Sequence, residues 1–132
     1  MKTLIVEDDF TSRLFLQTFL SRFGECHIAV TGKEAVEAFR MSTDNGSPYD
    51  LICMDIMLPE MDGQEAVKQI RAMEQARRAN LPSRGVKIIM TTAVTDIKVV
   101  MQSFRDLCDA YLFKPIDTTK LLSELKSFQL VK

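Results

Sequence analysis

The sequence has no surplus of either charge and therefore lacks the basic surface that nucleic-acid-binding proteins use. Its 17 lysine and arginine residues are balanced by 18 aspartate and glutamate residues, which gives a formal net charge of -1. Such a balance offers no extended positive potential to follow a phosphate backbone. We therefore expect no direct binding of nucleic acid.

The sequence also lacks the signals of thiol-based metal sites, membranes and secretion. Cys26, Cys53 and Cys108 include no Cys-x-x-Cys pair, and we interpret them as reduced thiols of a cytosolic protein. No apolar run is close to the length of about 20 residues that a helix needs to cross a bilayer. The N-terminus does not have the pattern of a signal peptide, because one lysine and a short apolar run are followed directly by Glu7-Asp8-Asp9. We expect a cytoplasmic protein without membrane insertion.

The chain has enough apolar residues for one core. At 132 residues and 46% hydrophobic content, it is too short for two typical domains. No internal repeat, low-complexity tract or interdomain linker divides it. We therefore expect a single domain that spans residues 1–132.

Five short apolar runs alternate with segments of helical periodicity. The runs are nearly continuous and rich in Ile, Leu and Val, as is typical of strands that are covered on both faces. They are residues 3–6, 27–30, 51–54, 87–91 and 110–113. This alternation predicts a doubly wound α/β fold with a five-stranded parallel sheet and right-handed crossovers. With strand order 2-1-3-4-5, ligands would bind between strands one and three.

Five helices are expected, one after each strand. The second begins with a capping box of Thr31 and Glu34, and the fifth begins with Asp117 as its N-cap. The apolar positions at helical spacing are Leu16, Phe19, Leu20 and Phe23, then Ala35, Ala38 and Phe39, then Ala66, Ile70 and Met73, then Ile97, Val100, Met101, Phe104 and Cys108, and finally Leu121, Leu122, Leu125 and Phe128.

Two long connections, residues 41–50 and 77–85, run from a helix into a strand and so lie at the edge opposite the ligand crevice. A basic cluster lies near the second connection. We interpret it as a solvated helix end and loop, with a docking patch for an acidic partner as the alternative. Its members are Arg71, Arg77, Arg78 and Arg84.

Polar and charged residues follow the predicted strands where parallel strands share one edge of the sheet. They are Glu7, Asp8 and Asp9 after strand one, Asp55 after strand three, Thr91 and Thr92 after strand four, and Lys114 after strand five. Two carboxylates about 4 Å apart repel by about 4 kcal/mol at an effective dielectric near 20, and one lysine offsets only part of this. A hard cation such as Mg²⁺ would balance the rest. Asp55 could then attack a phosphoryl group and form an aspartyl phosphate.

Each feature also has a purely structural interpretation. Glu7-Asp8-Asp9 alone would be a solvated turn before a helix, whose positive dipole end favours acidic side chains. Asp55 could cap a turn before Pro59. Thr92 and Lys114 are common residue types at strand ends. Their joint placement at one edge is what favours a site.

These residues resemble the response regulator receiver family, especially its single-domain, chemotaxis-type members. The resemblance covers essentially the whole chain, in the family's order and near its spacing. The matching segments are Val6-Glu7-Asp8-Asp9, Asp55-Ile56-Met57-Leu58-Pro59-Glu60-Met61-Asp62-Gly63, Thr92-Ala93 and Lys114-Pro115. The resemblance implies a flavodoxin-like fold and a regulatory domain of two-component signalling. Such a domain is not a classical enzyme and assists only its own phosphorylation and dephosphorylation.

The resemblance also implies residue roles. Asp55 would be the phosphoacceptor and would bind Mg²⁺, or Mn²⁺, together with Asp8, with Glu7 through a water molecule and with the Met57 carbonyl. Thr92 and Lys114 would contact the phosphoryl oxygens, and the Lys114-Pro115 bond would be cis. The donor would be a phosphohistidine of a sensor histidine kinase or a phosphotransfer protein.

The output implied by the family is a two-state shift. Thr92 would move toward the phosphoryl oxygens and Tyr111 would turn inward, which changes the face of helix four, strand five and helix five for an unidentified downstream protein. Tyr111 could equally be a static, half-buried ring. Val99 lies outside the apolar stripe of helix four, so it could be exposed on that face. His27, the only histidine, is expected to be a partly buried structural residue of strand two.

One departure from fast-hydrolysing relatives concerns the lifetime of the phosphorylated state. The residues two positions after Asp55 and Thr92 are Met57 and Val94, where such relatives often carry groups that orient water. We therefore expect slow self-dephosphorylation.

Two other functions use related folds or chemistry. A haloacid-dehalogenase-like phosphohydrolase also uses an Asp nucleophile with Mg²⁺, but it needs a second Asp where Met57 stands. A flavodoxin-like cofactor binder needs a Ser/Thr/Gly-rich phosphate cradle after strand one, where Glu7-Asp8-Asp9 would repel phosphate.

Overall fold

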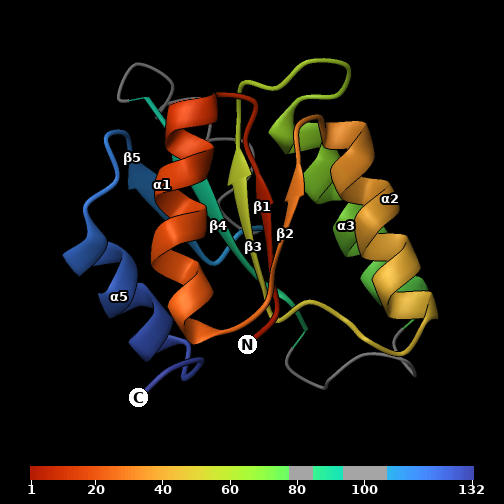
Figure 1. Ribbon diagram of the computed structural model, residues 1–132. Coiled ribbons are helices and arrows are strands. Elements are labelled where there is room, and N and C mark those ends of the chain that lie inside the picture. Colours follow the sequence, from red (N-terminus) through yellow and green to blue (C-terminus); the bar gives the residue numbers. More distant parts are fainter. Residues whose placement is uncertain (78–84, 94–106) are drawn as a thin grey trace.

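The computed structural model describes residues 1–77, 85–93 and 107–132 (Figure 1). The elements in chain order are β1 (Thr3–Val6), α1 (Phe10–Leu20), the short 3-10 helix η1 (Ser21–Phe23), β2 (Cys26–Ala29), α2 (Gly32–Asp44), β3 (Leu51–Asp55), α3 (Gly63–Ala76), β4 (Lys87–Thr92), β5 (Ala110–Phe113) and α5 (Thr118–Ser127). The helix expected around Ile97 to Phe104 falls outside the described residues. None of the described helices combines the length and apolar character needed to cross a bilayer.

The five strands form one parallel sheet in the order β2-β1-β3-β4-β5, which confirms the expected doubly wound topology. Helices α1 and α5 cover one face, and α2 and α3 cover the other (Figure 1). Successive side chains of β3 alternate between two buried cores. Leu51 and Cys53 belong to the core on the α1/α5 face, whereas Ile52 and Met54 belong to the core on the α2/α3 face.

Several element boundaries differ from the expectation by a few residues. β2 begins one residue earlier, and β3 and β4 each continue one residue further, to Asp55 and Thr92. The apolar pattern stops before these two polar residues, but the ladder of strand pairing does not, because Asp55 pairs with Thr91 and Thr92 with Phe113. Helix α2 continues to Asp44, so its last turn occupies the start of a segment expected to be a loop.

Local capping explains where the helices begin. Asp9 accepts a hydrogen bond from the Ser12 amide at 2.9 Å and starts α1. Thr31 caps α2 as expected by accepting from the Glu34 amide at 3.0 Å. The Glu34 carboxylate reaches back to the Val30 amide, one residue before the amide of a standard capping box. The Asp9 carboxylate is therefore used as a helix cap, unlike those of its two acidic neighbours, Glu7 and Asp8.

The interpretation of Arg71 as part of a solvated helix end is wrong. Its guanidinium donates to the backbone carbonyls of Leu107 at 2.8 Å and Val86 at 2.9 Å, and pairs with Asp109 at 3.0 Å. These contacts tie α3 to the segments that precede β4 and β5. Arg77 pairs with Asp44 across the α2 and α3 termini at 2.7 Å, while Arg78 and Arg84 lie outside the described residues.

Candidate functional site

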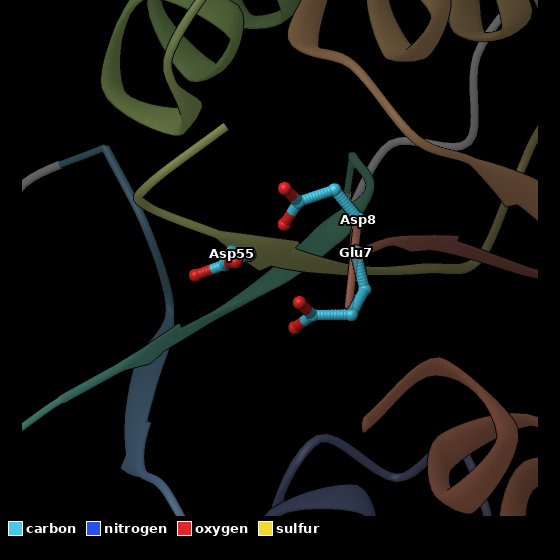
Figure 2. A group of neighbouring side chains, drawn as sticks. All are labelled: Glu7, Asp8 and Asp55. Carbon is cyan, nitrogen blue, oxygen red and sulfur yellow. The ribbon is translucent and has the colours of Figure 1, made fainter. Parts of the chain in front are cut away.

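Three acidic side chains come together at the carboxyl ends of the two central strands. In the parallel pairing of β1 with β3, Val6 lies opposite Met54, so the next residues, Glu7 and Asp55, are also neighbours. One oxygen each of Glu7, Asp8 and Asp55 lies within 4.8 Å of the other two. In Figure 2 the Asp8 carboxylate lies above the β3 ribbon and the Glu7 carboxylate lies below it, and both turn from the end of β1 toward Asp55. The sheet topology thus gathers carboxylates from distant parts of the chain.

The three carboxylates differ in their exposure. Glu7 and Asp55 are only 1% and 5% exposed, whereas Asp8 is exposed to solvent. A buried carboxylate loses hydration, which disfavours its charged form. The cluster therefore has an interior, poorly hydrated part and one open carboxylate at its rim.

Lys114, the residue directly after β5, supplies the positive charge of the cluster. Its ammonium nitrogen lies 2.8 Å from Glu7 Oε2 and 3.3 Å from Asp55 Oδ2. Burial raises the pKa of Glu7, with a further contribution from the nearby Asp55 charge, although the Lys114 hydrogen bond opposes this rise. Burial lowers the pKa of Lys114, but the hydrogen bond to Glu7 and the charge of Asp55 outweigh burial and raise it. Lys114 remains the cation of the site.

The backbone after Asp55 is held close to the site. The Met57 amide donates to Asp55 Oδ1 at 3.4 Å, while the Met57 side chain is 67% exposed. The start of α3 also packs here, because a Cβ atom at Gly63 would lie only 2.1 Å from the Asp55 carbonyl oxygen. Only glycine fits this approach. The sequence pattern included Gly63 but gave it no role, since the contact depends on tertiary packing.

The two residues expected to switch lie on β4 and β5, in different environments. Thr92 is buried, and its hydroxyl donates to the Ala93 carbonyl at 3.0 Å. Tyr111 is half-buried and packs against the core on the α2/α3 face. The Lys114-Pro115 peptide bond is cis, as the family resemblance implies. Val94 and Val99 fall outside the described residues.

His27 lies away from the acidic cluster, in β2 at the edge of the sheet. One ring nitrogen lies 2.7 Å from the Tyr49 hydroxyl and the other lies 2.8 Å from a Glu25 carboxylate oxygen. Both ring nitrogens therefore have partners among neighbouring side chains. These contacts agree with the interpretation of His27 as a structural residue.

Comparisons with known proteins agree with this geometry. Residues 3–126 match the family model described as the response regulator receiver domain. The hybrid signal transduction histidine kinase I of Dictyostelium discoideum is 33% identical over 133 positions, which cover 99% of this chain and 7% of that protein. Two further curated relatives, a probable transcriptional regulator of Cyanophora paradoxa and histidine kinase 1 of Arabidopsis thaliana, are covered over 47% and 7% of their lengths. The chain thus spans less than half of these relatives.

Two solved structures show the same fold. The receiver domain of the sensor histidine kinase PA1611 from Pseudomonas aeruginosa, with magnesium in its active site cleft, has 28% identity and a TM-score of 0.76, covering 96% of this chain and 95% of that chain. A chain from the co-crystal of the Saccharomyces cerevisiae phosphotransfer protein Ypd1 and the receiver domain of its downstream response regulator Ssk1 has 30% identity and a TM-score of 0.78, covering 97% and 88%.

Proposed function

Because this chain belongs to the response regulator receiver domain family of two-component signalling, we propose that Asp55 accepts a phosphoryl group and that residues 1–132 form one such domain. The observation that carries this proposal is the pairing of a buried Asp55 carboxylate with the Lys114 ammonium, beside two further carboxylates. A carboxylate in this setting is a nucleophile with a cation placed to neutralise incoming phosphoryl oxygens. The domain is regulatory and changes state with phosphorylation.

The donor set at this edge fits a hard divalent cation. Glu7, Asp8 and Asp55 offer three carboxylates against the single charge of Lys114, and oxygen ligands with an open rim suit Mg²⁺, or Mn²⁺ by the same chemistry. Asp8 and Asp55 would bind the ion directly, Glu7 would bind it through water, and the Met57 carbonyl would complete the set. When bound, the cation would neutralise charge on the phosphoryl oxygens.

The chain's own residues supply the rest of the reaction. Asp55 attacks phosphorus while the bond from phosphorus to the donor breaks and the donor group leaves with its electron pair. The Lys114 ammonium, 3.3 Å from Asp55, passes to a phosphoryl oxygen as the Asp55 negative charge is lost. Thr92 exchanges its bond to the Ala93 carbonyl for one to the phosphoryl group. Tyr111 then turns inward and changes the β5 and α5 face for a downstream protein.

The surface next to the site suits a protein donor. Phe10, Leu14 and Phe15 of α1 are 65%, 49% and 41% exposed. A cavity of about 200 Å³ extends from Phe15 to Lys114 and is also lined by Pro115 and Ile116. An apolar patch of this kind marks an interaction site. We propose that it docks the histidine-bearing domain of a sensor kinase or phosphotransfer protein, consistent with the Ypd1 co-crystal relative.

The haloacid-dehalogenase-like alternative has no support. Met57 stands where that chemistry needs a second aspartate, and the matched family is the receiver family.

The direct test is incubation of the chain with Mg²⁺ and acetyl phosphate, followed by mass spectrometry of the intact protein. The wild type should gain one phosphoryl group, and Asp55→Asn should gain none. Asp44→Asn, on the exposed end of α2, is the matched control and should behave as the wild type. An unmodified wild type, or an Asp55→Asn variant that still gains the group, would refute Asp55 as the acceptor.

A further inference from the structure

The site contains a buried hydroxyl that the reaction above does not use. Thr91 of β4 is 2% exposed, and its Oγ1 has no hydrogen-bond partner within the described part of the protein. Buried hydroxyls are normally hydrogen-bonded, because an unpaired polar group in the interior is costly. An unpaired hydroxyl in the strand next to Asp55 therefore calls for an explanation.

Strand register places Thr91 on the same face of the sheet as Asp55. Thr91 pairs with Asp55 on one side and with Leu112 on the other. Ile89, two residues before Thr91, belongs to the core on the α1/α5 face, as does Leu112. Since side chains alternate along a strand, Thr91 faces that side too, beside Asp55.

The path of the Lys114 side chain crosses this position. β4 lies between β5, which carries Lys114, and β3, which carries Asp55. The ammonium nevertheless lies 3.3 Å from Asp55 and 2.8 Å from Glu7, so the lysine stem must cross β4 on the face where Thr91 lies. Thr91 therefore lies on the face of β4 that the lysine side chain crosses. An ammonium has three N–H donors, so one remains when each of the two neighbouring carboxylates accepts one.

We propose that Thr91 is a positioning residue for Lys114. Its hydroxyl oxygen accepts a hydrogen bond from the ammonium after a small shift of the flexible lysine stem. This bond holds the ammonium across β4, where it pairs first with Asp55 and then with an incoming phosphoryl group. The consequence for phosphorylation rests on the function proposed above, whereas the contact itself does not.

Substitution of Thr91 separates this role from a purely structural one. Thr91→Val keeps the shape and removes the hydroxyl, so it should slow phosphorylation by acetyl phosphate by about tenfold, in line with the loss of one hydrogen bond to a charged group. Its melting temperature should stay close to that of the wild type, because burying a methyl group in place of a poorly paired hydroxyl offsets the lost bond to the ammonium. Thr91→Ser should restore the rate.

Thr3→Val is the matched control. Thr3 is also buried with an unpaired hydroxyl. It lies at the amino end of β1, whereas the acidic cluster lies at the carboxyl end. This variant should phosphorylate at the wild-type rate. If Thr91 acts through the lysine, Thr91→Val should cause no further loss in a Lys114→Met background. Equal rates for Thr91→Val and the wild type, or fully additive losses, would overturn the inference while Asp55 phosphorylation stands.

A second measurement does not require phosphorylation. In Mg²⁺-free protein, NMR can follow the exchange of the Lys114 ammonium protons with water. Exchange should be several times faster in Thr91→Val than in the wild type or Thr91→Ser. Equal exchange in all three proteins would reject the contact. If the wild type accepted no phosphoryl group, the proposed function would fail and this measurement alone would decide the role of Thr91.

Discussion

Glu7 and Asp55 are both buried carboxylates, but the contacts that restrain them differ in length. Glu7 accepts the Asp9 amide at 3.1 Å and lies 2.8 Å from the Lys114 ammonium. Asp55 has longer contacts, 3.4 Å to the Met57 amide and 3.3 Å to Lys114. The shorter hydrogen bonds are the stronger ones. Asp55 is therefore the carboxylate that can more easily exchange its partners, as a nucleophile must.

The raised pKa of Glu7 predicts how Mg²⁺ binding depends on pH. Burial is the main cause of the rise, so on acidification Glu7 takes up a proton at a higher pH than an ordinary glutamate. A metal ligand must be deprotonated, so proton uptake weakens binding. At pH 8, Mg²⁺ at about 100 times its dissociation constant should stabilise the fold by about 2.7 kcal/mol. This stabilisation should shrink as the pH falls through the Glu7 pKa.

Thermal melting across a Mg²⁺ titration at several pH values measures this effect. Without metal the sign is opposite, because the folded state binds the Glu7 proton more tightly than the unfolded chain, and this contribution to stability is lost as the pH rises through the folded-state pKa. Glu7→Gln should remove this metal-free loss and reduce the response to Mg²⁺. A melting temperature at pH 8 that does not change with the Mg²⁺ concentration would argue against a metal site.

Met57 predicts a long-lived phosphorylated state. Its amide contacts Asp55 and its side chain is exposed, and a thioether does not orient a water molecule for attack. Met57→Asn adds an amide that can do so and should speed phosphate loss by about tenfold, since positioning of a reactant is worth at least this much. Met57→Leu, which keeps the side chain apolar, is the control. The assay follows loss of the added phosphoryl mass, and wild-type decay within seconds would exclude slow hydrolysis.

At the scale of elements, the sequence predicts whatever is set by local periodicity. β1 and β5 have their expected bounds because their apolar runs coincide with their strand pairing. β3 and β4 extend to Asp55 and Thr92 because pairing with neighbouring strands continues past the apolar residues. Helix α2 extends to Asp44, where Arg40 pairs with Glu37 and Asp44 on the last turns.

The acidic cluster follows the same logic. Its gathering at one edge was predictable, because all strands of a parallel sheet end there. The short contact of Lys114 with Glu7 rather than Asp55 was not, since it depends on the path of one side chain across β4. The role of Arg71 was also hidden, because its acceptors near β4 and β5 are remote in sequence from α3.

Arg71 predicts a large local contribution to stability. It is mostly buried and satisfies two backbone carbonyls as well as Glu74 and Asp109. Arg71→Met keeps the apolar stem and removes every side-chain donor, which leaves partly buried acceptors unpaired. The free energy of unfolding should fall by about 2 kcal/mol in urea titrations.

Arg40 provides the control for this prediction. It also makes two ion pairs within three or four residues, but on the exposed surface of α2. Arg40→Met should change the unfolding free energy by no more than about 0.5 kcal/mol. Equal losses of unfolding free energy for the two variants would mean that the contacts of Arg71 stabilise the fold no more than the exposed ion pairs of Arg40 do.

At the scale of the whole molecule, the two faces of the sheet have different surroundings. The α1/α5 face contains the Lys114 arm and leads directly to the exposed apolar residues of α1. The α2/α3 face carries the larger of the two cores, and Tyr111 packs against it. The donor would therefore approach over α1, while the conformational response would travel through β5.

This arrangement predicts that α1 matters for a protein donor and not for a small one. Phe15→Ala, alone or with Phe10→Ala, should slow transfer from a purified phosphotransfer protein by about tenfold, as expected for an aromatic anchor of an interface. The rate with acetyl phosphate should be unchanged, because neither ring is among the contacts described above for Glu7, Asp8 and Asp55. Met41→Ala removes an equally exposed side chain from α2 and should affect neither reaction. Parallel losses with both donors would instead place Phe15 in the architecture of the site, and no loss with either would move the docking surface away from α1.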